Sequence, residues 1–134
     1  MTARPLQSLA LRQAIVERLR ADSDLTDLVP AEQIHGMRTP APPVWPFVRY
    51  GTPDEVPLRR GTEIRVTLHA FSKEQFEDEA STIVGALQTD LEDAVIELPH
   101  SLKAYLRFVG AQIVPDAAEA SAWHGIATWT ATIA

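Results

Sequence analysis

The sequence predicts an α+β fold, in which a mostly antiparallel sheet of about four strands carries two helices on one face. Two stretches repeat apolar residues at spacings of three and four, which is the period of a helix with one buried face. Four stretches are strand-like, most of them through alternation of apolar and polar residues. Their order is α-β-β-α-β-β, and strands this close together favour antiparallel pairing under a layer of helices. The 134 residues are predicted to form a single domain, 1–134.

The first helix is predicted over residues 6–21. Leu11, Ile15 and Leu19 recur at a spacing of four and define its buried face. Pro5 precedes them, and proline suits the first turn of a helix because its missing N–H is not needed there.

The first strand is predicted over residues 44–50. Pro46 favours a sheet edge or the start of the strand, because proline cannot donate a ladder hydrogen bond. Six prolines between residues 36 and 57 exclude a helix from this region. Residues 52–62 are expected to form a polar loop that projects from the sheet, because they are more numerous than a tight hairpin needs.

Residues 64–71 alternate most clearly and predict a half-buried strand. A helix is predicted directly after it, over residues 72–93. Ser72 and Gln75 have the Ser-x-x-Gln spacing of a capping box, which places the start of this helix at Ser72. Its expected buried stripe consists of Phe76, Ala80, Ile83, Val84, Leu87 and Leu91.

The last two strands are predicted over residues 102–114 and 122–133, with a turn or a longer loop between them. The strands and the second helix together predict one core between the sheet and the helices. This core is expected to contain Val66, Leu68, Ile83, Leu87, Leu106, Phe108 and Trp129.

The composition excludes several classes of function. The net charge is −6, with 12 Lys and Arg against 18 Asp and Glu, and this acidic balance argues against a general nucleic-acid binder. The absence of cysteine excludes a disulfide scaffold, a Cys-ligated zinc or iron–sulfur site and a thiol nucleophile. No stretch has the length and hydropathy of a membrane span or of a signal peptide, so no membrane partner is predicted.

The sequence contains none of the usual motifs of a catalytic or cofactor site. The glycine-rich signatures of nucleophile elbows, P-loops and dinucleotide-binding folds are absent. The four histidines, His35, His69, His100 and His124, lack the close spacing that is typical of a metal site. We therefore predict no catalytic, cofactor-binding or metal-binding residue and no cofactor, and we do not expect an enzyme.

The segment 74–97 carries eight acidic residues and no lysine or arginine. Acidic side chains near the start of the predicted helix interact favourably with the helix dipole, which accounts for those from Glu74 to Glu79. Glu92 and Asp93 lie at the opposite end of the helix, where a negative charge is unfavourable. A solvated helix face and a surface for a basic partner are both open interpretations.

Five stretches follow one another in a recognisable order. They are residues 25–29 after the first helix, Ile34-His35, Pro46–Gly51, Gly61–Ser72 leading into a helix, and His124–Ala131. In the order, the spacing and the total length of these stretches, the chain resembles the tail terminator, or tail-completion (head–tail joining), proteins of long-tailed phages and phage-like particles.

The resemblance implies a structural virion protein. Proteins of this family look like small α+β subunits that form a hexameric ring, which caps the tail tube and joins it to the head-completion (stopper) complex. Genomic DNA would pass through the ring without sequence-specific contact. The implied location is the head–tail interface of the virion, after assembly in the host cytoplasm.

Seven charged residues are candidates for contacts between subunits or with an adjacent ring. They are Arg49, Arg59, Arg60, Arg65, Arg107, Glu92 and Asp93. The three arginines of the predicted strands are expected on the sheet face opposite the helices, where they would approach the acidic segment of the next subunit. The two arginines of the projecting loop are expected to contact a neighbour or an adjacent ring. Two other interpretations of the strand arginines are simple exposure to solvent and a place in the channel, where they would grip the phosphates of DNA.

The competing function is a small α/β-plait enzyme or ligand-binding domain of unknown substrate. A monomer with a convergent polar cleft would favour that function, whereas an oligomer without such a cleft would favour the ring. A regulatory adaptor is a third possibility, and it would need a basic or peptide-binding groove.

Overall fold

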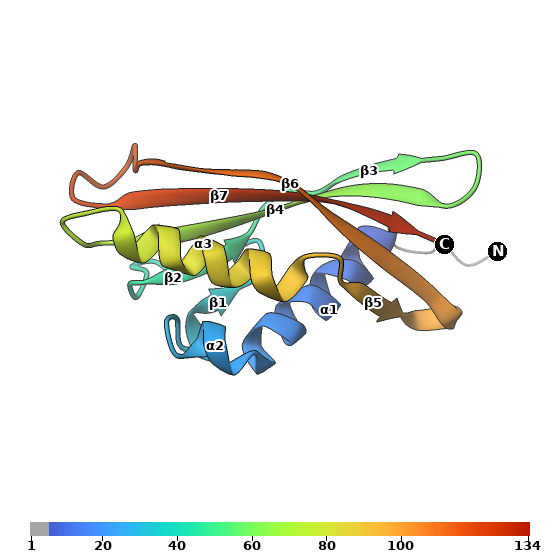
Figure 1. Ribbon diagram of the computed structural model, residues 1–134, viewed down its shortest axis with the longest axis horizontal. Helices are drawn as coiled ribbons and strands as arrows, with labels where there is room; N and C mark the ends of the chain where they lie inside the picture. The colour runs from blue at the N-terminus through green and yellow to red at the C-terminus, as the bar shows by residue number, and fades with distance from the viewer. Residues whose placement is uncertain (1–5) are drawn as a thin grey trace.

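The computed structural model describes residues 6–134 and has two layers, a sheet and a set of helices on one of its faces (Figure 1). The helices are α1 (Gln7–Ala21), α2 (Ser23–Thr26) and α3 (Asp78–Leu91). The strands are β1 (Ile34–His35), β2 (Phe47–Tyr50), β3 (Asp54–Pro57), β4 (Thr62–Ser72), β5 (Val95–Leu98), β6 (Leu102–Pro115) and β7 (Trp123–Ile133). Short 3₁₀ helices precede β1 and β6, at Ala31–Gln33 and Pro99–Ser101.

The sheet has seven strands in the order β1-β2-β4-β7-β6-β5, and β3 also pairs with β4. The pair of β1 and β2 is parallel and the other pairs are antiparallel, so the sheet is mixed. The chain is α+β, but the predicted sheet of about four strands in the order α-β-β-α-β-β is wrong. The missed strands β1, β3 and β5 have two to four residues each, which is too short for an alternation of side chains to be recognised.

The first helix and the core agree with the sequence. Helix α1 covers Gln7–Ala21, against a predicted range of 6–21, while Pro5 lies outside the described residues. The three side chains that define its predicted face, Leu11, Ile15 and Leu19, are fully buried. The seven predicted core residues belong to one buried cluster, with Phe108 packed against it as a partly buried member. The prediction of the core is therefore confirmed.

Ser72 ends a strand and does not begin a helix. It is the last residue of β4 and pairs with Trp123, and α3 begins only at Asp78. The Ser72 hydroxyl donates a hydrogen bond to Glu79 Oε1 at 2.8 Å. Phe76 lies in the connecting segment and is 61% exposed, so it does not join the buried stripe that the other five predicted residues form. The capping-box prediction is wrong because the ladder between β4 and β7 continues through this serine.

Residues 52–62 form most of a hairpin rather than the predicted loop. Strands β2 and β3 both pair with β4, on the side away from β7. Between them, residues 51–53 lie opposite Val66 and Thr67, so β2 and β3 form one edge strand with a bulge of one residue. Only residues 58–61 form a turn, at the tip of a hairpin that lies at one end of the sheet (Figure 1).

The hairpin is linked to the start of α1. Leu6, at the N-cap of α1, provides no side-chain hydrogen bond to the helix. Instead, the Ser8 N–H donates to Glu55 Oε1 on β3 at 2.8 Å. A carboxylate at a helix N-terminus satisfies an otherwise unpaired N–H and interacts favourably with the helix dipole. Strand β3 therefore supplies the cap that the helix lacks in its own sequence.

Candidate functional site

No helix among residues 6–134 covers the face of the sheet opposite α1 and α3, which we call the open face. Its side chains alternate with the buried ones along each long strand. They include Glu63, Arg65, Thr67, His69 and Phe71 on β4, His124, Ile126, Thr128, Thr130 and Thr132 on β7, Lys103, Tyr105 and Arg107 on β6, and Phe47 and Arg49 on β2. The centre of the open face is therefore polar and rich in threonine.

The three strand arginines lie on the open face, as the sequence predicts. Arg65 and Arg107 are the cross-strand neighbours of Thr130 on its two sides, so they form one row, and both are exposed. Arg49 pairs with His69, further along the sheet, and is half-buried. The structure therefore brings two of the three arginines together and separates the third.

The remaining candidates lie at two other places. Arg59 and Arg60 are exposed at the tip of the hairpin. Glu92 and Asp93 form the exposed turn between α3 and β5, which we call the acidic turn. Asp93 has a φ of 53°, a conformation that aspartate tolerates better than most residues. Ion pairs within residues 6–134 join Arg18 to Asp90 and Lys73 to Glu119, and none involves the seven candidates.

An aromatic cluster occupies the open face where β2, β4 and β7 meet. Phe71 stacks on Phe47 at 4.6 Å and on His124 at 4.4 Å between ring centroids. Trp45 packs edge-on against Phe47 at 4.9 Å. The two phenylalanines are only 5% and 8% exposed, although no helix covers them. Sequence reasoning missed this cluster, because its members lie far apart in the chain and only the strand register aligns them.

His124 of this cluster shares a hydrogen bond with His69, which packs beside it at 4.9 Å between ring centroids. The Nδ1 atom of His69 and the Nε2 atom of His124 lie 2.7 Å apart, so one ring donates its proton to the other. Burial lowers the pKa of His69 to about 4, with further lowering by Arg49 and His124. Burial also lowers the pKa of His124, opposed by Asp116 and reinforced by Arg49. Both rings are therefore neutral near pH 7.

These pKa shifts predict that the free energy of unfolding of the subunit decreases at acidic pH. As the pH falls from about 6.5 to about 4, an unfolded chain protonates His69 while the folded chain does not, so the free energy of unfolding decreases. Urea unfolding at pH 7.5 and at pH 5 measures this loss. His69→Gln removes the titrating group, so the difference between the two pH values is expected to be smaller in the variant. An equal difference in both proteins would contradict the prediction.

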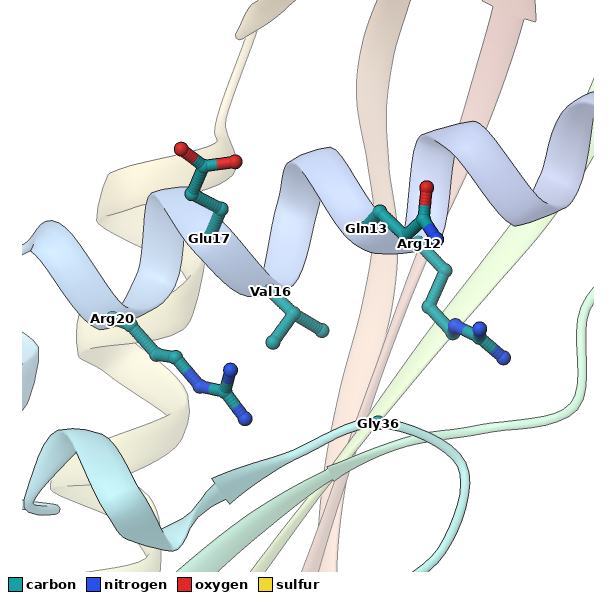
Figure 2. Close-up of a pocket in the computed structure, with 6 residues that line it drawn as sticks. All are labelled: Arg12, Gln13, Val16, Glu17, Arg20 and Gly36. Carbon is teal, nitrogen blue, oxygen red and sulfur yellow. The ribbon is translucent and has the colours of Figure 1, made fainter.

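The described surface carries several shallow, open grooves. One of them, with a volume of about 440 Å³, runs between α1 and the segment after β1 (Figure 2). Arg12 and Arg20 point toward that segment, and the Arg20 guanidinium donates to Ile34 O at 2.9 and 2.6 Å. Residues 6–134 contain no group of three or more side chains that could hold a metal ion. None of the helices in this part of the chain is long and apolar enough to cross a membrane.

Besides the outer sides of the terminal strands β1 and β5, two further stretches of strand edge have no partner strand among residues 6–134. β5 pairs with β6 only over residues 102–105, and the Leu106 N–H then donates to Ala94 O at 2.9 Å. Beyond this point, no described strand pairs with the outer edge of β6, residues 107–115. The outer edge of β3 is also unpaired in the described part of the chain. The open face and these two edges are the candidate functional site.

Three comparisons place this architecture among known proteins. The family described as tail completion protein gp17 matches residues 13–134. A chain in the virion of a native gene transfer agent particle is 21% identical, with a TM-score of 0.79, over 94% of this chain and 96% of that chain. The gp17 protein of bacteriophage SPP1 is 24% identical, with a TM-score of 0.61, over 97% of this chain and 93% of that chain. No curated protein matches the sequence. At these identities, the two structures establish a likeness of fold.

Proposed function

Because this chain belongs to the tail completion protein gp17 family, we propose that it forms a ring of identical subunits that closes the tail tube of a phage or phage-like particle. The family that the sequence predicted is confirmed, and the chain is a structural component of the virion. Beyond this, the proposal has four parts. One domain, 1–134, is the ring subunit, six copies form the ring, the ring lies between the tail tube protein and the head-completion (stopper) complex, and genomic DNA passes through it.

The observation that carries the proposal is that the open face and several strand edges of the sheet are uncovered in the described subunit. An isolated subunit exposes the open face, two unpaired strand edges and several large apolar side chains, among them Val56, Val95 and Tyr105. An unpaired edge is a template for another chain and is usually protected. In a ring, each subunit shows its neighbour a different side, so one repeated heterologous contact can cover two different edges.

The test combines the size of the assembly with its effect on tails. The purified protein is expected to have the mass of a closed oligomer in solution and to appear as rings in electron micrographs. Added to a growing tail tube, it is expected to bind one end and stop elongation. A protein that stays monomeric at high concentration and leaves tube length unchanged would contradict the proposal and would favour the ligand-binding alternative.

Arg65 and Arg107 provide a second prediction. One arrangement of the ring places their row against the acidic segment 74–97 of the next subunit. In that arrangement, the double variant Arg65→Glu/Arg107→Glu loses assembly at low salt, because like charges then face each other. The wild-type ring should loosen as salt is added, since the Debye length is about 10 Å at 0.1 M. Sedimentation across a salt series measures both effects, and unchanged assembly of the variant would contradict the contact.

A further inference from the structure

The outer edge of β6 is long and has few of the features that protect an edge. Of the nine residues 107–115, all but the bulged Val109 pair with β7 on one side, and the segment has no described strand on the other. Arg107 is the only charged residue among them, and Val109 is 57% exposed. A bulge between Phe108 and Gly110 is the one irregularity of the ladder. Such an edge offers a row of backbone N–H and C=O groups to another strand.

Strand β3 is the second unpaired edge, and it lies on the opposite side of the sheet. It pairs with β4 through one edge, and its other edge has no described backbone partner. Its exposed face carries Val56, and the tip that follows carries Leu58, with 53% and 41% of their surfaces exposed. β3 and the outer half of β6 lie at opposite ends of the sheet (Figure 1). One copy can therefore offer its β3 to the β6 of another copy, and the contact can repeat.

The directions of the strands decide how such a contact would form. β3 is antiparallel to β4, β4 to β7 and β7 to β6, so β3 and β6 run in opposite directions. A rotation about an axis to which the strands are moderately tilted keeps neighbouring strands in these relative directions. It therefore brings β3 of one copy antiparallel to β6 of the next, which is the more stable pairing. No strand has to reverse.

The directions of β3 and β6 also determine where the hairpin tip of one subunit lies on the next subunit. β5 already occupies the first part of the outer side of β6 and begins at Val95, just after the acidic turn. A β3 strand added along residues 107–115 continues the line of β5 and points its tip at the start of β5. Arg59 and Arg60 of the tip then meet Glu92 and Asp93 of the acidic turn. Two exposed positive charges face two exposed negative charges.

We propose, on the basis of the ring proposed above, that neighbouring subunits join through one continuous sheet. β3 of one subunit pairs with residues 107–115 of the next, and its Arg59-Arg60 tip docks on the acidic turn, Glu92-Asp93. In a continuous sheet the open face of one subunit adjoins the open face of the next, so the acidic turn meets the Arg59-Arg60 tip and not the row of Arg65 and Arg107. This contact therefore predicts that Arg59→Glu/Arg60→Glu loses assembly while Arg65→Glu/Arg107→Glu keeps it.

The proposal requires a stagger between neighbours. Within one subunit, Pro57 is level with Ala104, through Thr62 on β4 and Ile133 on β7. In the proposed contact, Pro57 of one subunit must instead be level with Phe108 of the next subunit, or with a residue beyond it. Relative to Ala104, this is a shift along the strand of at least four residues, or about 13 Å. A closed ring has no net translation along its axis, so the strands must tilt relative to that axis, as they do in a β-barrel.

The first experiment mixes two variants that each keep one half of the contact. Val109→Lys/Ala111→Lys places two charges on the edge of β6, and Arg59→Glu/Arg60→Glu reverses the tip. Each variant alone is expected to sediment as a monomer, with the circular dichroism of the wild type. An equimolar mixture is expected to form dimers and nothing larger, because the intact tip of the first variant can bind only the intact edge of the second. Rings formed by either variant alone, or a mixture that stays monomeric, would overturn the proposal.

The second experiment uses the absence of cysteine in the chain. The double variant Arg60→Cys/Glu92→Cys is expected to form intersubunit disulfides on oxidation, giving a ladder of covalent oligomers up to the size of the ring. The matched control Arg60→Cys/Glu74→Cys carries its second cysteine on the same acidic segment but away from the acidic turn, and it is expected to stay uncrosslinked. If Arg60→Cys/Glu92→Cys forms rings that do not crosslink, the edge contact is overturned while the ring is left intact. A wild-type protein without rings would overturn both the contact and the proposed function.

Discussion

Replacing Trp129 with alanine is expected to lower the free energy of unfolding of the subunit by about 3–5 kcal/mol. Trp129 is fully buried and is one of the largest buried side chains. It lies on β7, the central strand, between its cross-strand neighbours Val66 and Phe108. The Phe108 ring packs edge-on against it at 5.5 Å between centroids. Truncation would leave a cavity that strands paired on both sides cannot close.

Urea unfolding at a concentration where the protein is monomeric measures this loss. Trp129→Phe is the matched control, because it keeps an aromatic ring in the core and removes the Trp129 Nε1 donor, which has no described partner. The control is expected to cost much less than the alanine variant, since less volume is lost and no donor stays unsatisfied. A loss below about 1 kcal/mol for Trp129→Ala would contradict the central place of this side chain in the core.

Replacing residues 53–60 with a glycine-serine run of equal length is expected to abolish the joining of tails to heads while the subunit stays folded. These residues form β3 and most of the tip, and their hydrogen bonds to the rest of the described subunit include the ladder to β4 and the bond that Glu55 accepts from the Ser8 N–H. The loss of that helix cap should cost about 1 kcal/mol of stability. The loss of the outer edge should remove the contact between subunits altogether.

The yield of joined particles in an assembly mixture, with circular dichroism of the isolated subunit, measures the two effects separately. Glu55→Gln is the matched control, because it weakens the cap of α1 without changing the edge or the tip. This control is expected to reproduce the small loss of stability and to keep normal joining. A glycine-serine variant that joins particles at normal yield would make the hairpin dispensable.

Long periodic stretches made much of the fold predictable. The spacing of Leu11, Ile15 and Leu19 marks α1, and the alternation around Trp129 and Val66 marks the central strands, because burial imposes a period on each element. The number and order of the strands were predicted wrongly, because β1, β3 and β5 have only two to four residues each and are too short to show a period. The helix start predicted at Ser72 was wrong for another reason. The local capping pattern of this residue competes with its pairing to β7, a strand far away in the sequence.

For the candidate site, the sequence predicted the face on which the strand arginines lie, but neither the aromatic cluster nor the unpaired edge of β6. Alternation alone places Arg65 and Arg107 on the open face, and the structure confirms it. The sequence did not reveal that the outer edge of β6 is unpaired, because this follows from where β5 begins and ends. The hydrogen bond between His69 and His124 also depends on a register that only the completed sheet defines.

The bond between Glu55 and Ser8 makes the start of α1 a reporter of assembly. An amide exchanges with solvent at a rate set by local opening, and the first turn of a helix opens easily unless its N–H groups are held. Glu55 lies on the strand whose outer edge the neighbour would pair, so fixing that strand also fixes the carboxylate that holds the Ser8 amide. Deuterium uptake at the start of α1 should therefore slow when subunits close into a ring through this strand.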